Sequence, residues 1–197
     1  MDIQPVTLQG RVVRLEPLSE SHVPDLAAVG LDPDIWRYMR YGAVESQADL
    51  LRWVKHLLAL QQRGTDLPFA VISLESGKAI GATRYLNIDR EDRNLEIGGT
   101  WYGAAYQRTA VNTESKYLLL DHAFEHLECI RVQLKTDLRN LRSQHAIERL
   151  GAVREGVLRD HVILEDGYVR SSVYYSILLH EWPTVKAHLE ALLSAHS

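Results

Sequence analysis

The order of the expected secondary-structure elements constrains the fold more than any other feature of this sequence. Three strands come close together, at Phe69–Leu74, Ala79–Asn87 and Leu95–Tyr102, and the first two are joined by the tight turn Glu75-Ser76-Gly77-Lys78. Helices and strands then alternate as far as Gly151, which suits a helix C-cap. This order predicts an α+β fold with one mixed, largely antiparallel central sheet flanked by helices.

The other elements follow from hydrophobic periodicity and from capping residues. Between Ser46 and Gly64, apolar residues recur with the spacing of one helix face. Pro183 suits the first position of a closing helix. The remaining expected elements are a strand at Arg11–Glu16, a short helix from Ser19 or Ser21 to Val29, a helix at Val111–Leu127, a strand at Ile130–Thr136, a helix at Leu141–Leu150, and a hairpin of Val157–Leu164 and Val169–Leu178.

Composition excludes several classes of protein. The chain has 197 residues, 46% of them hydrophobic, and we expect a single domain over residues 1–197. One cysteine allows no internal disulfide and no cysteine-rich zinc site. The formal charge of −4 argues against a general nucleic-acid binder. No apolar run is long enough for a membrane span, and the N-terminus lacks a secretory signal. We therefore expect a cytoplasmic protein without a nucleic-acid or membrane partner.

A strand–loop–helix junction is the first candidate for chemistry. The strand ends near Tyr102, the loop covers Gly103–Ala110, and a helix begins near Val111. Unpaired N–H groups and the helix dipole at such a helix start can hold a phosphate or pyrophosphate. Many junctions of this kind bind nothing, so the junction alone decides little.

Motifs further along the chain carry a family resemblance. Asn140-Leu141-Arg142-Ser143 opens a helix that ends at Leu150-Gly151. The other motifs, in order, are LEIG at 95–98, AFE at 123–125, EGVLR at 155–159, DG at 166–167, YSIL at 175–178 and EW at 181–182. Their order and spacing from about Leu8 to Leu192 resemble the GNAT acetyltransferases, and within them the RimJ/RimL type that acetylates ribosomal proteins.

The resemblance implies a fold and a co-substrate. In the GNAT fold the central sheet is splayed between strands four and five, here Leu95–Tyr102 and Ile130–Thr136. The pantetheine arm of acetyl-CoA would enter this splay, with its pyrophosphate on the following loop and helix start. The implied cofactor-binding residues are Thr100, Trp101, Tyr102, Gln107, Arg108, Thr109, Ala110, Val111, Asn112, Thr113, Asn140 and Ser143.

The pyrophosphate loop departs from the family pattern. Ala110 and Asn112 occupy the positions of two expected glycines. Asn is the non-glycine residue that best tolerates the left-handed region, and the N–H groups remain. Local positive charge would come from basic residues, with Arg108, Lys116, Arg139 and Arg142 as the nearest candidates. We expect weaker but real CoA binding.

Glu96 and Ser143 are the candidate catalytic residues. Attack of an amine on a thioester requires the neutral amine, and a partly buried carboxylate beside the splay can accept the proton, often through water. The alternative for Glu96 is an ordinary ion pair across the sheet, with Arg84 as partner. Many GNAT enzymes protonate the departing thiolate with a Tyr four residues after Ser143; here that position is Ile147, which leaves Ser143 or water. The alternative for Ser143 is a simple first-turn helix residue.

An aromatic stretch is the candidate acceptor pocket. Trp36, Tyr38 and Tyr41 lie where the GNAT fold places the helices that cover its acceptor, and His161 lies on a strand expected near the same side. The alternatives are core packing for the aromatic residues and ordinary exposure for the histidine. Acidic residues near this stretch would attract a cationic amine.

These features together predict an acetyl-CoA-dependent N-acetyltransferase that acts on a small-molecule amine or a peptide N-terminus in a ternary complex. The rivals are a catalytically weak acyl-CoA-binding or regulatory module on the same fold, and a protein-interaction domain that binds no CoA. We expect no metal, because His122 and His126 lack a third ligand nearby. The GNAT fold often dimerises through its C-terminal hairpin or helix, so Val169–Leu178 and the helix at Trp182 are where a homodimer would form.

Overall fold

A computed structural model of the chain describes residues 1–195, and its centre is one eight-stranded sheet. The strands follow the order β1-β2-β3-β4-β5-β6-β8-β7. Neighbouring strands are antiparallel except β5 and β6, which are parallel. The strand bounds are Leu8–Gln9 (β1), Val13–Pro17 (β2), Leu67–Ser73 (β3), Ala79–Asp89 (β4), Asn94–Tyr102 (β5), Arg131–Asp137 (β6), Val153–Ile163 (β7) and Val169–Leu178 (β8).

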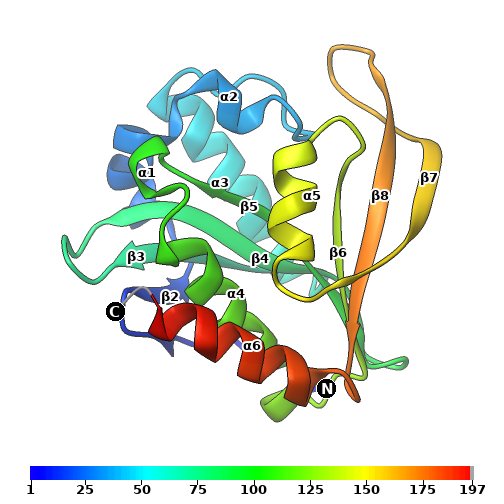
Figure 1. Cartoon of the computed structure of the whole chain (residues 1–197). Coiled ribbons are helices and arrows are strands. Elements are labelled where there is room, and N and C mark those ends of the chain that lie inside the picture. Colours follow the sequence, from blue (N-terminus) through cyan, green and yellow to red (C-terminus); the bar gives the residue numbers. More distant parts are fainter. Residues whose placement is uncertain (196–197) are drawn as a thin grey trace.

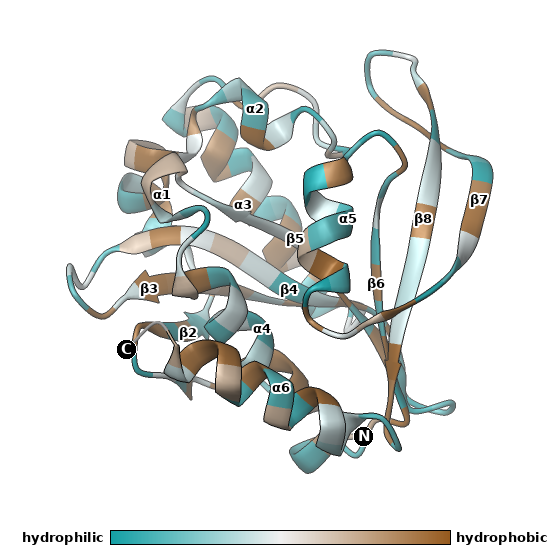
Figure 2. Cartoon of the chain, in the orientation of Figure 1, coloured by the Kyte–Doolittle hydropathy of each residue, from teal (hydrophilic) through white to brown (hydrophobic). Residues whose placement is uncertain are grey.

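Helices lie on both faces of the sheet, and the β7–β8 end of the sheet extends beyond them (Figure 1). Two separate apolar clusters account for this arrangement: one joins the sheet to α4, α5 and α6, and the other joins β3, β4 and β5 to α1, α2 and α3. Figure 1 shows these layers, and Figure 2 shows α3 and α6 as helices of mixed apolar and polar residues, as expected for helices with one buried stripe. The helices are α1 (Val23–Gly30), α2 (Pro33–Trp36), α3 (Gln47–Gln62), α4 (Ala110–Asp121), α5 (Leu141–Glu148) and α6 (Trp182–Ser194).

The two halves of the sheet separate between β5 and β6. The parallel pairing covers only Asn94–Glu96 of β5, opposite Arg131–Gln133 of β6. Beyond Glu96, β5 continues to Tyr102 beside β4, whereas β6 continues beside β8. Figure 1 shows β6, β8 and β7 rising away from β5 on the right-hand side. The splay that the resemblance implied is therefore present.

A β-bulge bends β5 just beyond this point. Ala82 pairs with Trp101 and Arg84 pairs with Gly98, so two residues of β5 lie opposite Thr83 of β4. Gly99, inside the bulge, has a φ of +58°. Glycine adopts this left-handed conformation without the steric cost that a side chain adds, which explains the Gly98-Gly99 pair inside a strand.

Most of the expected elements are confirmed, but some differ, and the short strand β1 was not expected. The long helix expected at Val111–Leu127 is an α-helix only as far as Asp121, and His122–His126 forms a π-helical turn. Within the aromatic stretch, Pro33–Trp36 forms one helical turn with Asp32 as its N-cap. β7 begins at Val153 rather than at Val157. Within residues 1–195, none of the helices combines the length and the apolar character that crossing a membrane requires.

Candidate active site

Glu96 is the last residue of β5 that pairs with β6, and its side chain is almost fully buried (2% exposed). Its Oε2 atom accepts hydrogen bonds from Asn87 Nδ2 and Gln133 Nε2, each over 2.9 Å. Lys135 Nζ lies 3.2 Å from the same oxygen. Three donors on one oxygen fix the orientation of the carboxylate and offset part of the cost of burying it.

The second oxygen of Glu96 lies at the opening of the sheet. Oε1 accepts no hydrogen bond from any residue between 1 and 195, and a Cβ built on Gly98 would lie 3.2 Å from it. The glycine therefore keeps this oxygen uncrowded. Arg84, the expected ion-pair partner of Glu96, pairs instead with Asp66, with 3.1 Å between Nη1 and Oδ2. The sequence-based choice of partner was wrong, because β6 brings Lys135 to the face that carries Glu96.

The three side chains that hold Glu96 were missed in the sequence. Gln133 and Lys135 are two residues apart in β6, so they lie on the same face of the strand. This regular spacing of polar residues within an expected strand could have indicated a shared polar site. Asn87 has a φ of +50° and sits where the pairing of β4 with β5 changes register. No sequence pattern marks that irregularity.

The loop before α4 has the capped helix start that an anion site needs. Thr109 is the N-cap, and its Oγ1 accepts a hydrogen bond from the N–H of Val111 over 3.3 Å and donates one to the carbonyl of Tyr106 over 2.8 Å. Arg108 takes the left-handed conformation, with a φ of +62°. We expected Asn112 to be the residue that tolerates this conformation, but Asn112 lies inside α4. Ala110 and Val111 are its first helical residues.

Side-chain contacts bring the loop together with α5. Gln107 donates from Nε2 to the carbonyl of Tyr102 over 3.0 Å and accepts at Oε1 from Arg142 Nη1 over 2.9 Å. Asn140 caps α5, since its Oδ1 accepts from the N–H of Ser143 over 3.0 Å. These contacts bring the end of β5, the loop and α5 close together. Thr113 faces the same helix, with its Oγ1 2.6 Å from Arg149 Nη2.

Of the last residues of β5, Trp101 and Tyr102 point into the core, whereas Thr100 is only half-buried. Trp101 (4% exposed) packs in the apolar cluster under α1 and α3, and Tyr102 packs in the cluster under α4. Burial raises the pKa of Tyr102. Thr100 is half-buried, and its hydroxyl lies 2.7 Å from that of Thr83 and 2.5 Å from Lys116 Nζ. Trp101 and Tyr102 are thus available to a ligand mainly through their backbone.

The expected acceptor residues lie in different surroundings. Trp36 is a core residue (3% exposed), with ring centroids 5.5 Å from Trp53 and 5.4 Å from Trp101. Tyr41 lines a pocket of about 600 Å³ together with Asn87, the residue that binds Glu96. Burial raises the pKa of Tyr41. Of the aromatic stretch, only Tyr41 lines this pocket.

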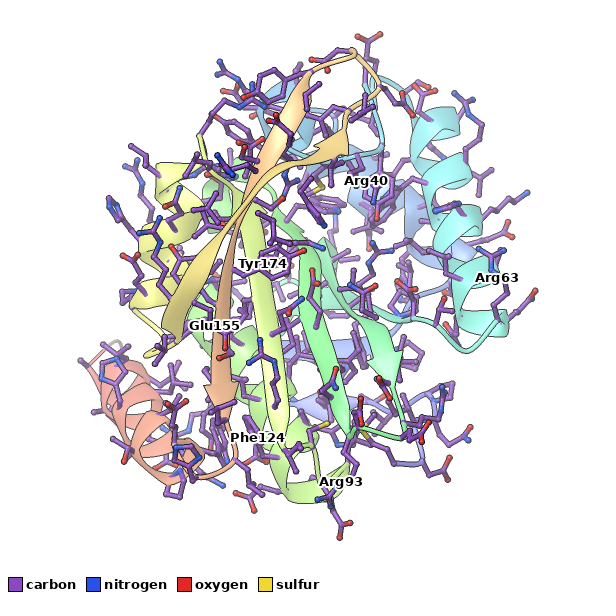
Figure 3. The ribbon with its side chains drawn as sticks, turned by 90° about the vertical axis from the view of Figure 1, so that its right-hand side faces the viewer. Arg40, Arg63, Arg93, Phe124, Glu155 and Tyr174 are labelled. Atoms are coloured by element: carbon purple, nitrogen blue, oxygen red, sulfur yellow. The ribbon has the colours of Figure 1, made fainter. Side chains whose placement is uncertain are left out.

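His161 lies on the open face of the sheet. Its Nε2 is 3.1 Å from the hydroxyl of Tyr174, and its Nδ1 is 3.3 Å from the hydroxyl of Ser172. Figure 3 looks onto this face, with Tyr174 on the strand β8. Lys135 Nζ lies 5.6 Å from the centre of the Tyr174 ring, so His161 and Glu96 are joined through two intervening side chains.

The histidine pair in the π-helical turn after α4 and the single cysteine have structural explanations. The rings of His122 and His126 lie 5.4 Å apart, and His122 stacks on Tyr85. No group of three or more metal-ligating side chains occurs in the part of the chain that the structure describes. Cys129 is buried, and burial raises the pKa of its thiol to about 11, which suits a packing role.

Known proteins share this architecture. Residues 13–153 match the family described as the acetyltransferase (GNAT) domain. The Bacillus subtilis (strain 168) protein YdaF, provisionally named a ribosomal N-acetyltransferase, is 33% identical over 109 residues, which are 55% of this chain and 58% of YdaF. A crystal structure from T. thermophilus is 40% identical, with a TM-score of 0.89 over 98% of this chain and 100% of that chain. Mycobacterium smegmatis RimJ, solved in complex with CoA-disulfide, has the same fold at 22% identity, with a TM-score of 0.81 over 95% of both chains.

Proposed function

Because the chain belongs to the GNAT acetyltransferase family, we propose that it transfers the acetyl group of acetyl-CoA to a primary amine by direct attack in a ternary complex. One observation carries the proposal. Glu96 sits where β5 leaves β6, with one oxygen held by three donors and the other free beside Gly98. A fixed carboxylate with one free oxygen, placed at an opening in the sheet, suits removal of a proton from the acceptor.

The residues around the opening fit a long, anionic thioester. Past Glu96, the edge of β5 has no register partner in β6, so its backbone can pair with the amides of a pantetheine arm. The start of α4 offers backbone N–H groups to a pyrophosphate, and the exposed Arg108 adds a positive charge beside them. When bound, acetyl-CoA supplies the activated acetyl group. In this proposal Asn140 and Ser143 face the thioester end.

Proton movement is assigned to two side chains. Oε1 of Glu96 accepts the proton of the attacking amine, directly or through one water. The hydroxyl of Ser143, or water, passes a proton to the CoA thiolate and recovers one from solvent, while Glu96 releases the amine proton to solvent. A thiol has a pKa of about 8.5, so its thiolate leaves without a strong acid.

A catalytically weak acyl-CoA-binding module is the second candidate. One observation favours it: Ile147 occupies the position where many GNAT enzymes carry a Tyr, and this side chain is 7% exposed and packed in the main core. It donates no proton to a leaving thiolate. Turnover therefore separates the two candidates, since both predict CoA binding.

The acceptor class and the setting belong to the same proposal. The name of YdaF refers to ribosomal N-acetylation, which favours a protein N-terminus over a small amine. We propose action in the cytoplasm, as one domain, with a homodimer contact along β8 or α6.

The first prediction tests Glu96 directly. Release of free CoA from acetyl-CoA is measured with a panel of peptides and small amines, for the wild type and for Glu96→Gln. We expect kcat to fall by about 10²-fold or more, because the amide cannot accept the proton, while the affinity for acetyl-CoA is unchanged.

Glu155→Gln is the matched control. This carboxylate lies on the same open face (Figure 3), but it pairs with Arg131 away from the opening. We expect its turnover to stay at the wild-type level. If Glu96→Gln kept wild-type turnover, Glu96 would not be the base; if no acceptor reacted although acetyl-CoA bound, the second candidate would be correct.

A further inference from the structure

Arg40 is an uncompensated cation close to the proposed reaction centre. Its side chain is exposed and makes no ion pair or hydrogen bond with any other described residue. Arg40 and Tyr174 are both labelled in Figure 3, which looks onto the open face of the sheet. A charge without a partner beside a reaction site is available to a ligand.

Two more cations lie on this face with only partial compensation. Lys135 shares the carboxylate of Glu96 with two amide donors. Arg170 is 7% exposed, and its nearest carboxylate is Asp137, with 3.9 Å between Nε and Oδ2. Arg139 also binds Asp137 and lies closer, at 2.9 Å. The face around Glu96 therefore has a surplus of positive charge.

The positive charges on this face also affect His161. Its pKa is lowered by burial and, further, by the charges of Lys135, Arg170 and Arg40, whereas Glu96 opposes the shift. An ammonium group placed here would meet the same repulsion, so a bound amine is held in its neutral, reactive form. The same potential attracts an acceptor that carries its own negative charge.

A pocket beside Glu96 has room for such a charge. It measures about 600 Å³, and Asn87 in its lining also binds Glu96. Two cations of the lining are paired with carboxylates that line it too, Arg52 with Asp49 and Arg84 with Asp66. Arg40 is therefore the lining cation without an ion pair within residues 1–195. Arg84 is 8% exposed, and its Nε donor has no hydrogen-bond acceptor among the residues described. The lining also holds Glu165, which lies against Gly42. A cation without an ion pair, Arg40, and the unpaired Nε donor of Arg84 in a pocket next to the reacting amine suit a carboxylate.

Resting on the acetyl transfer proposed above, we propose that this enzyme selects acceptors that carry a carboxylate close to the reacting amine, with Arg40 as the side chain that receives it. Two sources share this chemistry: an acidic residue next to a peptide N-terminus, and the α-carboxylate or side chain of a free amino acid. The surplus of cations disfavours a polyamine, contrary to the cationic acceptor that the acidic residues of the sequence suggested.

The test compares acceptors that differ only in charge. The first series consists of peptides with the same sequence except at the second and third residues, which are Glu, Gln or Lys. The second series consists of free glutamate and free glutamine. We expect kcat/KM to be about tenfold higher for the Glu peptide than for the Gln peptide, and lowest for the Lys peptide. Arg40→Gln should remove most of this preference, and Arg40→Glu should reverse it. High salt should weaken the preference of the wild type.

Two variants serve as controls. Arg37→Gln removes an exposed cation that lies over Tyr38 outside the pocket, and its preference should match the wild type. Glu165→Gln removes the opposing charge from the lining, and its preference for the Glu peptide should stay equal or rise.

Binding of the same peptides can be measured directly by tryptophan fluorescence in the presence of CoA. This measurement tests the acceptor preference even if no acceptor reacts. If no acceptor reacts but the Glu peptide binds more tightly than the Gln peptide, the acceptor inference stands and the transfer reaction fails. Equal binding and equal kcat/KM for the two peptides, or an unchanged preference in Arg40→Gln, would overturn the inference. Reaction of free glutamate at the rate of the Glu peptide would identify amino acids as the source of the carboxylate.

Discussion

Lys116 is a buried cation without a carboxylate partner. It is 5% exposed on α4, and its Nζ contacts only two hydroxyls in the described chain, at 2.5 Å from Thr100 Oγ1 and 3.4 Å from Thr83 Oγ1. Burial lowers the pKa of this lysine from 10.5 to about 7. Sequence reasoning treated Lys116 as a charge available to the cofactor, but the structure places it behind Thr100, charged in only part of the molecules at neutral pH.

Replacing Lys116 should stabilise the protein in a pH-dependent way. Because the folded pKa lies below the unfolded one, the unfolded state binds the extra proton between about pH 7 and 10.5. The wild type therefore gains stability as the pH rises through this window, by at most about 1.4 kcal/mol per pH unit. We expect Lys116→Met to have the larger free energy of unfolding at pH 7, with a difference that shrinks toward pH 10. Urea unfolding at each pH measures it.

Lys55→Met, on the exposed surface of α3, is the control for adding a methionine. Thr83 and Thr100 still hydrogen-bond each other, over 2.7 Å, after the lysine is removed. A stability difference that stayed constant from pH 7 to pH 10 would contradict the lowered pKa.

At the scale of single elements, one buried carboxylate ties α4 to the sheet. Glu114 is 4% exposed and accepts backbone hydrogen bonds from Arg11, Val12 and Val13 over 2.7–2.8 Å. These bonds tie α4 to the start of β2. The helix that we propose to hold the pyrophosphate is thereby fixed to the sheet beneath it.

The N-cap of α4 gives a test of the phosphate site. Thr109→Ala should lower the free energy of unfolding by about 1 kcal/mol, because the N–H of Val111 loses its acceptor. We also expect weaker binding of acetyl-CoA by isothermal titration calorimetry, because the first turn of the helix loses its fixed geometry.

Ser46→Ala is the matched control, since Ser46 caps α3 by accepting from the N–H of Asp49. It should cost similar stability and leave acetyl-CoA binding unchanged. If Thr109→Ala bound acetyl-CoA as tightly as the wild type, the start of α4 would not be the phosphate site.

The sequence predicted elements and motifs better than it predicted side-chain partners. Periodicity and capping located the helix beginning after Ser46 and the strands that end at Tyr102 and Asp137, because each pattern is local. The pairing of Glu96 with Lys135 depends on the register between β5 and β6, which no local pattern encodes. The core position of Trp36 depends on contacts with Trp53 and Trp101, each far away in the chain.

At the scale of the whole molecule, the sheet consists of two halves that share little backbone pairing. Residues Asn94–Glu96 alone pair with β6, while α5 and the loop before α4 are linked through Gln107 and Arg142. A ligand that lies between the halves would contact both. In our proposal acetyl-CoA is that ligand, so its binding should stabilise the whole fold as well as the local backbone.

Hydrogen exchange measures the two effects separately. At about 100 times its Kd, a ligand adds about 2.7 kcal/mol to the free energy of unfolding, so amides that exchange only through global unfolding slow by about 100-fold. We expect this factor for the buried strand β3. Within residues 98–102, the amides that point away from β4 lie on the unpaired edge of β5, so they should exchange fast without ligand and be newly protected by acetyl-CoA.

The exposed strand β7 provides the internal control, because it lies at the far edge of the sheet from β5. Its outward-facing amides exchange through local opening, so acetyl-CoA should leave their rates unchanged. Global slowing without new protection at 98–102 would place the ligand elsewhere on the fold. Protection at 98–102 without global slowing would show that the ligand binds β5 alone and does not join the two halves of the sheet.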